Sequence, residues 1–166
     1  LAKTRQIGVQ VVENSDISAS GDVKTRVITN YGSVTYKDND TTKAITDYSD
    51  PLNRQTIKSD SFDNRGNSLH QTVYSEGNVE GAWLFSGMQE FTNDHIDIHD
   101  QTGHSIVKNY NAAAMSAASY MGFDDIDYLQ RDKFGNVEIQ NITSYTEHNL
   151  FREYKEVRNT YADDVS

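Results

Sequence analysis

Three residues near the middle of the chain have the types and spacing of metal ligands. His95, Asp97 and His99 alternate along the sequence, and His104 follows shortly after them. Alternate residues of a β-strand share one face, so these side chains are predicted to project together. Imidazole and carboxylate groups bind zinc, which needs three protein ligands or more. The competing interpretation is a solvated polar strand face that holds no metal.

Two acidic groups offer the oxygen ligands that calcium prefers. One group contains Asp124, Asp125 and Asp127, and the other contains Asp38, Asn39 and Asp40. Neither group matches the EF-hand loop or the calcium-binding nonapeptide repeat. Because charges at turns and on edge strands also prevent unwanted pairing, a structural role is the alternative to calcium. We expect no cofactor, and calcium is the alternative.

Sequence motifs of enzymes are missing from the chain. There is no nucleophile elbow, phosphate-binding loop, dinucleotide fingerprint or His-Glu-x-x-His motif. There is also no cysteine, which excludes disulfides, thiolate metal sites and cysteine nucleophiles. We therefore predict a protein that is not an enzyme and has no catalytic residues.

The elements that would position the candidate ligands are β-strands separated by a recurring turn. The turn has Asp at its first position and Gly or Asn at its fourth, where φ is expected to be positive. It is predicted at Asp50 to Asn53, Asp63 to Gly66, Asp100 to Gly103 and Asp132 to Gly135, with a degenerate copy ending at Gly21. An interval of 32 residues separates positions 21 and 53, and again positions 103 and 135. This interval favours a repeat, and the alternative is an ordinary antiparallel domain whose hairpins share turn chemistry.

Two motifs around the first two of these turns carry a family resemblance. They are Asp50-Pro51-Leu52-Asn53-Arg54-Gln55-Thr56 and Phe62-Asp63-Asn64-Arg65-Gly66-Asn67. The region 48–74 thereby resembles the YD repeat of the Rhs and teneurin-type surface and toxin proteins, with partial matches at 100–110 and 132–145. The family pattern has Gly at position 53 and Tyr at position 62, and it has no counterpart of residues 75–99. The resemblance implies an extracellular β-strand spiral that serves as a shell, stalk or adhesive surface.

The composition is acidic and poor in apolar residues. The formal net charge is −10, and the Lys and Arg residues form no cluster, so nucleic acid is not an expected partner. Apolar residues make up only 36% of the chain, which predicts a thin core and sheets with a wetted face. No run of about 18 apolar residues is present, so we expect no membrane span.

Alternation of apolar and polar residues predicts strands along most of the chain. They are expected at 6–13, 22–31, 34–36, 42–48, 54–62, 67–75, 94–99, 104–110, 125–131, 136–145 and 148–161, with loop at 14–21 and a short helix at 111–119. Segment 76–93 contains Trp83 and Phe85, which are interpreted either as a core-capping excursion or as a contact surface. The predicted fold class is mainly β, with antiparallel hairpins in an elongated repeat-like sheet, sandwich or spiral.

The leading functional hypothesis is a structural protein of the bacterial cell surface or extracellular space. It would form part of a fibre, stalk or shell, with copies of itself as partners in a homopolymer or tandem array. Residues 1–166 are interpreted as one β-rich domain or as a segment of a longer repetitive polypeptide, since the chain starts at Leu1 without Met. The alternatives are an adhesive module that binds surface glycans and a fragment of a toxin-delivery shell.

Overall fold

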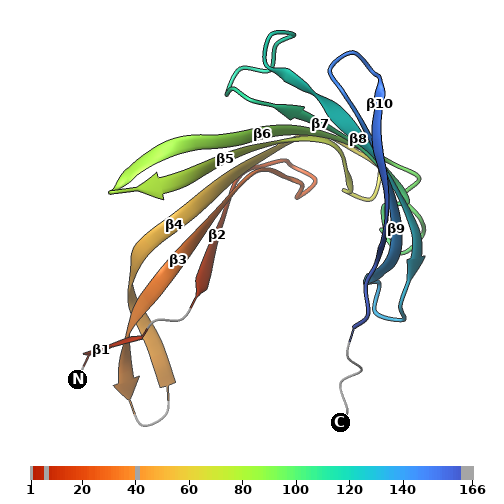
Figure 1. The fold of residues 1–166 in the computed structure, drawn as a ribbon. Coiled ribbons are helices and arrows are strands. Elements are labelled where there is room, and N and C mark those ends of the chain that lie inside the picture. The colour runs from red at the N-terminus through yellow and green to blue at the C-terminus, as the bar shows by residue number, and fades with distance from the viewer. Residues whose placement is uncertain (1, 6–7, 40–41, 162–166) are drawn as a thin grey trace. The chain divides into compact units, whose positions relative to one another are not determined.

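The chain consists of antiparallel β-strands joined by hairpins (Figure 1). The structure is a computed structural model that describes residues 2–5, 8–39 and 42–161. The strands are β1 (Ala2–Arg5), β2 (Val9–Ile17), β3 (Val23–Asn39), β4 (Thr42–Phe62), β5 (Ser68–Val79), β6 (Ala82–Asp94), β7 (His104–Tyr110), β8 (Tyr120–Arg131), β9 (Val137–Tyr145) and β10 (Phe151–Arg158). No helix occurs among the described residues. The prediction of a mainly β fold of antiparallel hairpins is confirmed.

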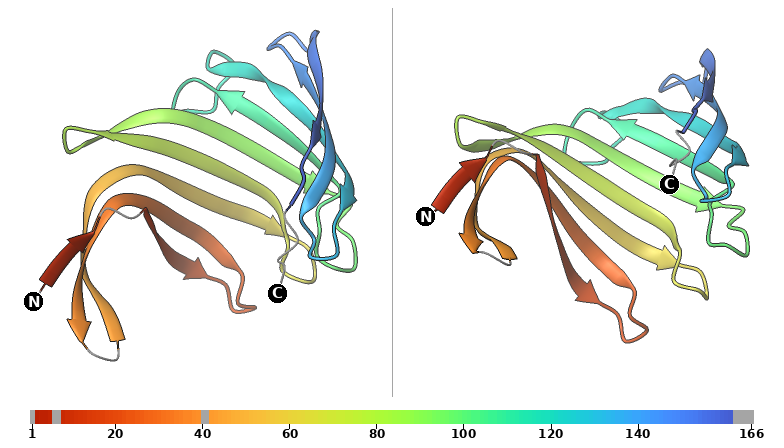
Figure 2. Two further views of the ribbon diagram at one scale, coloured as in Figure 1. Left: turned by 60° about the horizontal axis from the view of Figure 1, so that its bottom comes forward. Right: turned by 90° about the horizontal axis from the view of Figure 1, so that it is seen from below.

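All ten strands belong to one sheet, in the order β1-β3-β4-β5-β6-β7-β8-β9-β10, with β2 also paired to β3. From β2 to β10, strands that follow one another in the chain are therefore neighbours in the sheet, as short hairpin connections require. Strand β1 pairs with β3 instead of β2. Figure 2 shows this sequence of neighbours from two further directions. Strand β10 has only β9 beside it within the described part of the chain, so its other edge is unpaired.

The contacts between Cα atoms divide the chain into two compact units. Unit 1 contains Leu1–Lys58 and Val73–Gly87, and unit 2 contains Ser59–Thr72 and Met88–Ser166. Strands β4, β5 and β6 each contribute residues to both units. The turns at 63–67, 97–101, 132–136 and 146–150 belong to unit 2, as do His70, His95 and His104. The turn at 18–22 and Trp83 belong to unit 1.

The buried core is thin, as the low apolar content predicts. Among the described residues, the buried apolar side chains are Val34, Val73, Met88 and Val107, which are between 1% and 9% exposed. Several serines are buried as deeply, and each is hydrogen-bonded. Ser105 donates to Asn93 over 2.8 Å, for example. Cross-strand polar pairs and the backbone ladder therefore carry much of the cohesion that a compact domain obtains from apolar packing.

Three of the predicted turns have the expected chemistry. In the turn at 63–67, Gly66 N–H donates to the Asp63 carbonyl over 3.2 Å, and φ of Gly66 is +89°. The Asp63 carboxylate accepts the backbone N–H groups of Arg65 and Asn67 at 2.9 Å each. The same pattern occurs at 132–136, where φ of Gly135 is +87°, and at 18–22, where a serine hydroxyl replaces the carboxylate.

The turn predicted at Asp50 to Asn53 is wrong, because β4 continues through these residues. Asn53 pairs with Asn30 and Pro51 pairs with Tyr31, which leaves one extra residue in β4 and makes a β-bulge. The left-handed residue is Asp50, with φ of +56°, and not Asn53. Proline cannot donate to a strand ladder, and a bulge is one of the few places in a sheet that accept it.

The turn predicted at Asp100 to Gly103 is also wrong, since it lies three residues further towards the N-terminus. Asp97 is its first residue and accepts the N–H groups of His99 and Gln101 through its side chain at 2.8 and 3.0 Å. Asp100 takes the left-handed position, with φ of +61°. Gly103 lies outside the turn. A further turn of this kind, at 146–150 with φ of +58° at Asn149, was not predicted.

Three other predicted elements differ from the structure in type or extent. The strand predicted at 94–99 is wrong, because β6 ends at Asp94 and loop follows. The helix predicted at 111–119 is a loop of turns and bends, in which the Ser119 hydroxyl donates to the Ala114 carbonyl over 2.6 Å. The loop predicted at 14–21 is partly strand, since β2 extends to Ile17. Residues 6 and 7 of the first predicted strand lie outside the described residues.

Candidate functional site

Neighbouring turns in unit 2 are bonded to one another through their side chains. Arg65, in the turn at 63–67, donates to the carbonyl oxygens of Ile96 and Asp97 at 3.2 and 2.5 Å. From the same turn, the Asn67 amide donates to Asp100 over 2.8 Å. These bonds join the β4–β5 hairpin to the β6–β7 hairpin at their ends, independently of the strand ladder.

A second link joins the turn at 97–101 to the turn at 132–136. Arg131 donates to the Thr102 carbonyl over 2.5 Å and to the Gly135 carbonyl over 3.1 Å. A Cβ atom on Gly135 would lie 2.5 Å from Nε2 of Gln101, so this glycine also permits close approach between the turns. The three turns form a continuous row, which we call the turn row. Its members are residues 63–67, 97–101 and 132–136.

The predicted contact residues Trp83 and Phe85 lie on one face of β6 in unit 1. The Arg54 guanidinium lies 4.5 Å from the centroid of the Trp83 ring and is held by Glu76 at 2.6 Å. Phe85 is 36% exposed and lies 5.7 Å from Tyr74 between ring centroids. Because Arg54 covers one face of the indole, Trp83 is a poorer stacking platform for a sugar than its sequence context indicates.

A histidine bridges three strands in unit 2 by hydrogen bonds to two carboxylates. Nδ1 of His70 lies 2.7 Å from Asp60 on β4, and Nε2 lies 3.0 Å from Glu90 on β6. Glu90 also accepts bonds from Lys108 over 2.9 Å and from the Tyr110 hydroxyl over 3.1 Å. We call these five residues the His70 bridge.

The contacts of the His70 bridge shift its pKa values in opposite directions. The bond to Glu90 raises the pKa of His70 above 6.5, against an opposing effect of burial and with support from Asp60. Burial alone would raise the pKa of Glu90, but bonds from His70, Lys108 and Tyr110 outweigh it and lower the value from 4.5 to about 2. Burial and the bond to Glu90 raise the pKa of Tyr110 to about 12. The charged forms of His70 and Glu90 therefore stabilise each other.

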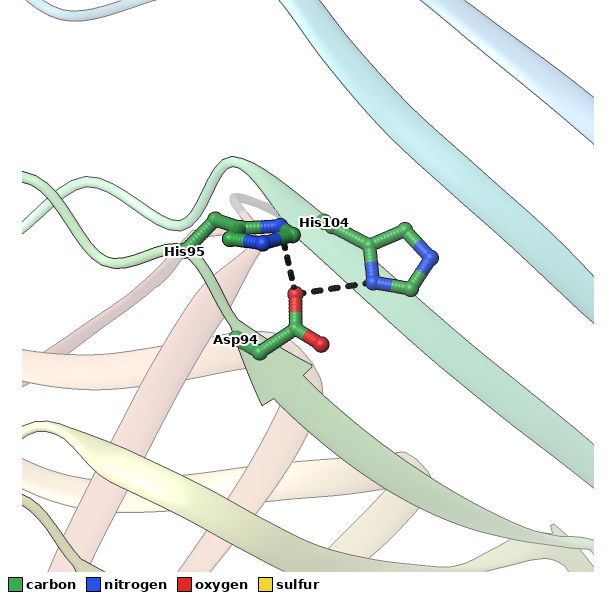
Figure 3. Close-up of side chains that lie close together, drawn as sticks. All are labelled: Asp94, His95 and His104. Carbon is green, nitrogen blue, oxygen red and sulfur yellow. Dashed lines mark hydrogen bonds and ion pairs between the residues drawn. The ribbon is translucent and has the colours of Figure 1, made fainter.

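A second histidine cluster lies at the ends of β6 and β7. Nδ1 of His104 and Nδ1 of His95 both contact Oδ1 of Asp94, at 2.8 and 3.0 Å (Figure 3). On its other side, Nε2 of His104 lies 2.8 Å from Asp125 on β8. Burial acts to lower the pKa of His104, but Asp125 and Asp94 outweigh it, so the pKa is raised above 6.5. The ligand atoms of Asp94, His95 and His104 lie within 4.8 Å of one another, as do those of His104, Asp125 and Asp127.

The structure separates the residues that the sequence groups as metal ligands. His95 joins His104, but Asp97 and His99 belong to the turn at 97–101, where backbone N–H groups occupy the Asp97 carboxylate. The predicted common strand face of His95, Asp97 and His99 is therefore wrong. Asp94 is not among the predicted ligands, although its position directly before His95 in the sequence is a signal for it.

The acidic groups considered for calcium are not brought together as complete sites. Asp125 and Asp127 lie on one face of β8, whereas Asp124 points to the other. There it accepts bonds from Ser144 over 2.6 Å and from Asn109 over 3.2 Å. In the second group, Asp40 and the side chains of Asp38 and Asn39 lie outside the described residues.

A shallow cavity of about 430 Å³ lies beside the 111–119 loop in unit 2. It is lined by Lys108, Tyr110, Met115, Ser116, Ala117 and Tyr120. The two tyrosine rings lie 5.7 Å apart between centroids. Tyr110 is already bonded to Glu90, so the cavity offers apolar walls and few convergent polar groups.

The unpaired edge of the sheet at β10 is rich in exposed aromatic and charged side chains. Leu150, Phe151 and Tyr154 are 65%, 64% and 54% exposed. Glu153 forms an ion pair with Lys155 over 2.8 Å, on side chains that are both accessible to solvent. This strand therefore combines free backbone groups with an alternation of opposite charges.

Comparison with known proteins does not assign the chain to a family. No family model matches it, and neither a curated protein nor a solved structure does so. The described part of the chain contains no helix that is long and apolar enough to cross a membrane.

Proposed function

We propose that this chain is a structural β-sheet protein that assembles with copies of itself through the edge strand β10. The observation that carries the proposal is the exposed, unpaired β10 edge. A free strand edge offers a row of N–H and C=O groups to another strand, and proteins usually shorten, charge or cover such edges. The β10 edge is charged, but its charges alternate in sign, and it also carries Phe151 and Tyr154, both more than half exposed.

Exposed apolar side chains elsewhere in the chain support the same proposal. Leu52, Leu129 and Phe134 are examples of large apolar side chains that are more than half exposed. Contact with further copies of the chain would remove part of this apolar surface from water.

The sequence of β10 is complementary to itself in one antiparallel register. If a two-fold axis passes beside Tyr154, Tyr154 of one copy faces Tyr154 of the other. Glu153 of each copy then lies opposite Lys155 of the other, which gives two pairs of opposite charge. Such cross-strand pairs contribute about 0.2–1 kcal/mol each, and like charges in these places are unfavourable by similar amounts. The charges of Glu153 and Lys155 therefore favour this register, and substitutions that make the facing charges alike should disfavour it.

We further propose that the chain is a YD-type repeat segment of the bacterial cell surface. The turns at 63–67 and 132–136 support this, because they share the residue pattern Asp-x-x-Gly-Asn and the same hydrogen bonds. The positive-φ residues Gly66, Asp100 and Gly135 are spaced 34 and 35 residues apart. The extracellular location rests on the resemblance to the YD repeat alone.

The molar mass of the purified chain in solution tests the assembly. We expect light scattering coupled to size exclusion to show a mass that rises with protein concentration towards that of a dimer or larger species. Electron microscopy of the same samples distinguishes dimers from filaments. A monomer at every concentration would contradict the proposal.

Charge exchange in β10 tests the register. Lys155→Glu and Glu153→Lys each place like charges opposite one another and should shift the assembly towards monomer. The double exchange Glu153→Lys with Lys155→Glu should restore it. Lys24→Glu is the matched control, because it makes the same charge change at an exposed position of the inner strand β3 and should have little effect. Equal assembly of all four variants would show that β10 does not form the contact.

A further inference from the structure

Asp94, His95 and His104, which we call the Asp94 cluster, each place one potential ligand atom close to the other two. The two imidazole Nδ1 atoms approach the same carboxylate oxygen from different strand ends, at 2.8 Å for His104 and 3.0 Å for His95 (Figure 3). Their ring centroids are 5.9 Å apart. The two nitrogens and the oxygen therefore lie within 4.8 Å of one another.

The spacing of these atoms is close to that of a tetrahedral zinc site. Zinc binds imidazole nitrogen at about 2.0–2.1 Å and carboxylate oxygen at about 2.0–2.2 Å, which places neighbouring ligand atoms about 3.3 Å apart. The observed contacts need to lengthen by only about 0.5 Å to reach this value. The His95 and Asp94 side chains are 81% and 53% exposed and have room for this movement.

Asp125 gives His104 the orientation of a metal ligand. It lies 2.8 Å from Nε2 of the ring. When the ring proton sits on Nε2 and is donated to Asp125, Nδ1 presents its lone pair towards Asp94 and His95. A carboxylate behind a histidine ligand is the usual way in which proteins fix the tautomer and increase the basicity of the ligand.

Gly103 brings His95 to the cluster. The Gly103 N–H donates to the His95 carbonyl over 3.1 Å, and a Cβ atom at position 103 would lie 2.9 Å from that oxygen. His95 itself has φ of +51°, a conformation that few residues other than glycine adopt. The tight backbone contact turns the chain back after β6, so that His95 faces His104 instead of continuing the strand.

We propose that Asp94, His95 and His104 bind a divalent transition-metal ion of the zinc class, with Asp125 as the positioning residue. Two imidazoles and one carboxylate favour zinc, nickel or copper over calcium, which takes six to eight oxygen ligands. A fourth position remains open for water. The competing arrangement uses Nε2 of His104 with Asp125 and Asp127, which has one nitrogen ligand instead of two.

Zinc titration of the chain, made without a histidine tag and stripped of metal, tests the proposal. Calorimetry should show one saturable site per chain. His95→Ala should weaken zinc binding at least tenfold, and Asp125→Asn should weaken it by about 10–100-fold. His148→Ala is the matched control, because His148 is also highly exposed and also contacts a neighbouring carboxylate, Glu147, at 3.3 Å. It should bind zinc as the unmodified chain does.

Two results would overturn the proposal. The first is the absence of saturable zinc binding by the unmodified chain. The second is unchanged affinity in His95→Ala together with lost affinity in Asp127→Ala, which would assign the ion to the competing arrangement. Far-UV circular dichroism of each variant establishes that its sheet is intact. His95 and Asp127 are both exposed, so neither substitution is expected to unfold the chain.

Discussion

The two histidine clusters of unit 2 have the same plan and different surroundings. In each, an imidazole bridges two carboxylates from neighbouring strands: Asp60 and Glu90 around His70, and Asp94 and Asp125 around His104. Around His70, Lys108 also contacts Glu90 and adds a further positive charge. Around His104, the additional group is a second imidazole, that of His95.

This difference separates a structural bridge from a ligand set. Glu90 is satisfied by three donors and its side chain is only 19% exposed, so the His70 bridge is closed to further partners. Asp94 has two imidazoles beside it and its side chain is 53% exposed. A histidine between two carboxylates therefore stabilises the strands where Lys108 is the additional group. Where His95 is the additional group, the same arrangement offers ligands to a metal ion.

The largest expected effect is the loss of the Glu90 charge. Glu90→Gln removes the anion shared by His70, Lys108 and Tyr110, and should lower the free energy of unfolding by about 2–3 kcal/mol in urea titrations. Asp94→Asn, on a more exposed carboxylate, should cost less than about 1 kcal/mol. Equal losses would show that the two clusters do not differ as described.

A smaller effect is expected from filling the space beside Gly103. Gly103→Ala places a methyl group against the His95 backbone and should cost about 1–2 kcal/mol. It should also weaken zinc binding, because His95 moves. Gly87→Ala is the control, since an added Cβ there has no atom within 4 Å. Unaltered stability and zinc affinity in Gly103→Ala would contradict the role given to this glycine.

The pH dependence of stability tests the His70 bridge. Because the folded-state pKa of His70 is raised above 6.5, its stabilisation is complete below pH 6.5 and is lost as the pH rises through the folded-state value. Because the pKa of Glu90 is lowered from 4.5 to about 2, its contribution is complete above pH 4.5 and is lost as the pH falls towards 2. The melting temperature should therefore fall on both sides of a plateau from pH 4.5 to 6.5. His70→Gln should make the alkaline fall smaller, and the fall that remains is expected from His104, whose pKa is also raised. An alkaline fall as large as that of the unmodified chain would contradict the assignment.

The smallest expected effect concerns zinc at the His70 bridge. His70→Gln should leave zinc affinity within about twofold of the unmodified chain, because Lys108 and Tyr110 occupy the Glu90 carboxylate. Calorimetry under the same conditions as for His95→Ala provides the measurement. A large loss of zinc affinity in His70→Gln would remove the distinction between the two clusters.

Local chemistry made part of the fold predictable from the sequence. The turns at Asp63 and Asp132 depend on an aspartate that caps its own backbone and on a glycine three residues later, all within five residues. The turn predicted at Asp50 fails because the pairing of β4 with β3 overrides it. The same residues then form a bulge, and Pro51 sits where the ladder is interrupted. Sequence spacing alone does not distinguish these two outcomes.

The candidate metal site was less accessible to sequence reasoning. The expectation that His95, Asp97 and His99 share a strand face assumed that β6 continues past Asp94. An aspartate in the left-handed position, Asp100, is enough to form the turn without glycine, and this frees Gly103 to pack against His95. His104 is predicted to join these residues across a turn at Asp100 to Gly103, and the structure places it beside His95 although the turn lies at 97–101. The contribution of Asp125 depends on the pairing of β7 with β8, which residue spacing does not reveal.

The turn row gives this sheet an asymmetric response to mechanical load. Arg65 and Arg131 fasten the loop ends of successive hairpins to neighbouring carbonyl groups. A force that peels one hairpin away from the next at this end must break these arginine hydrogen bonds before it reaches the backbone hydrogen bonds between the strands. Peeling of the same hairpins should therefore begin more easily from the opposite ends of their strands.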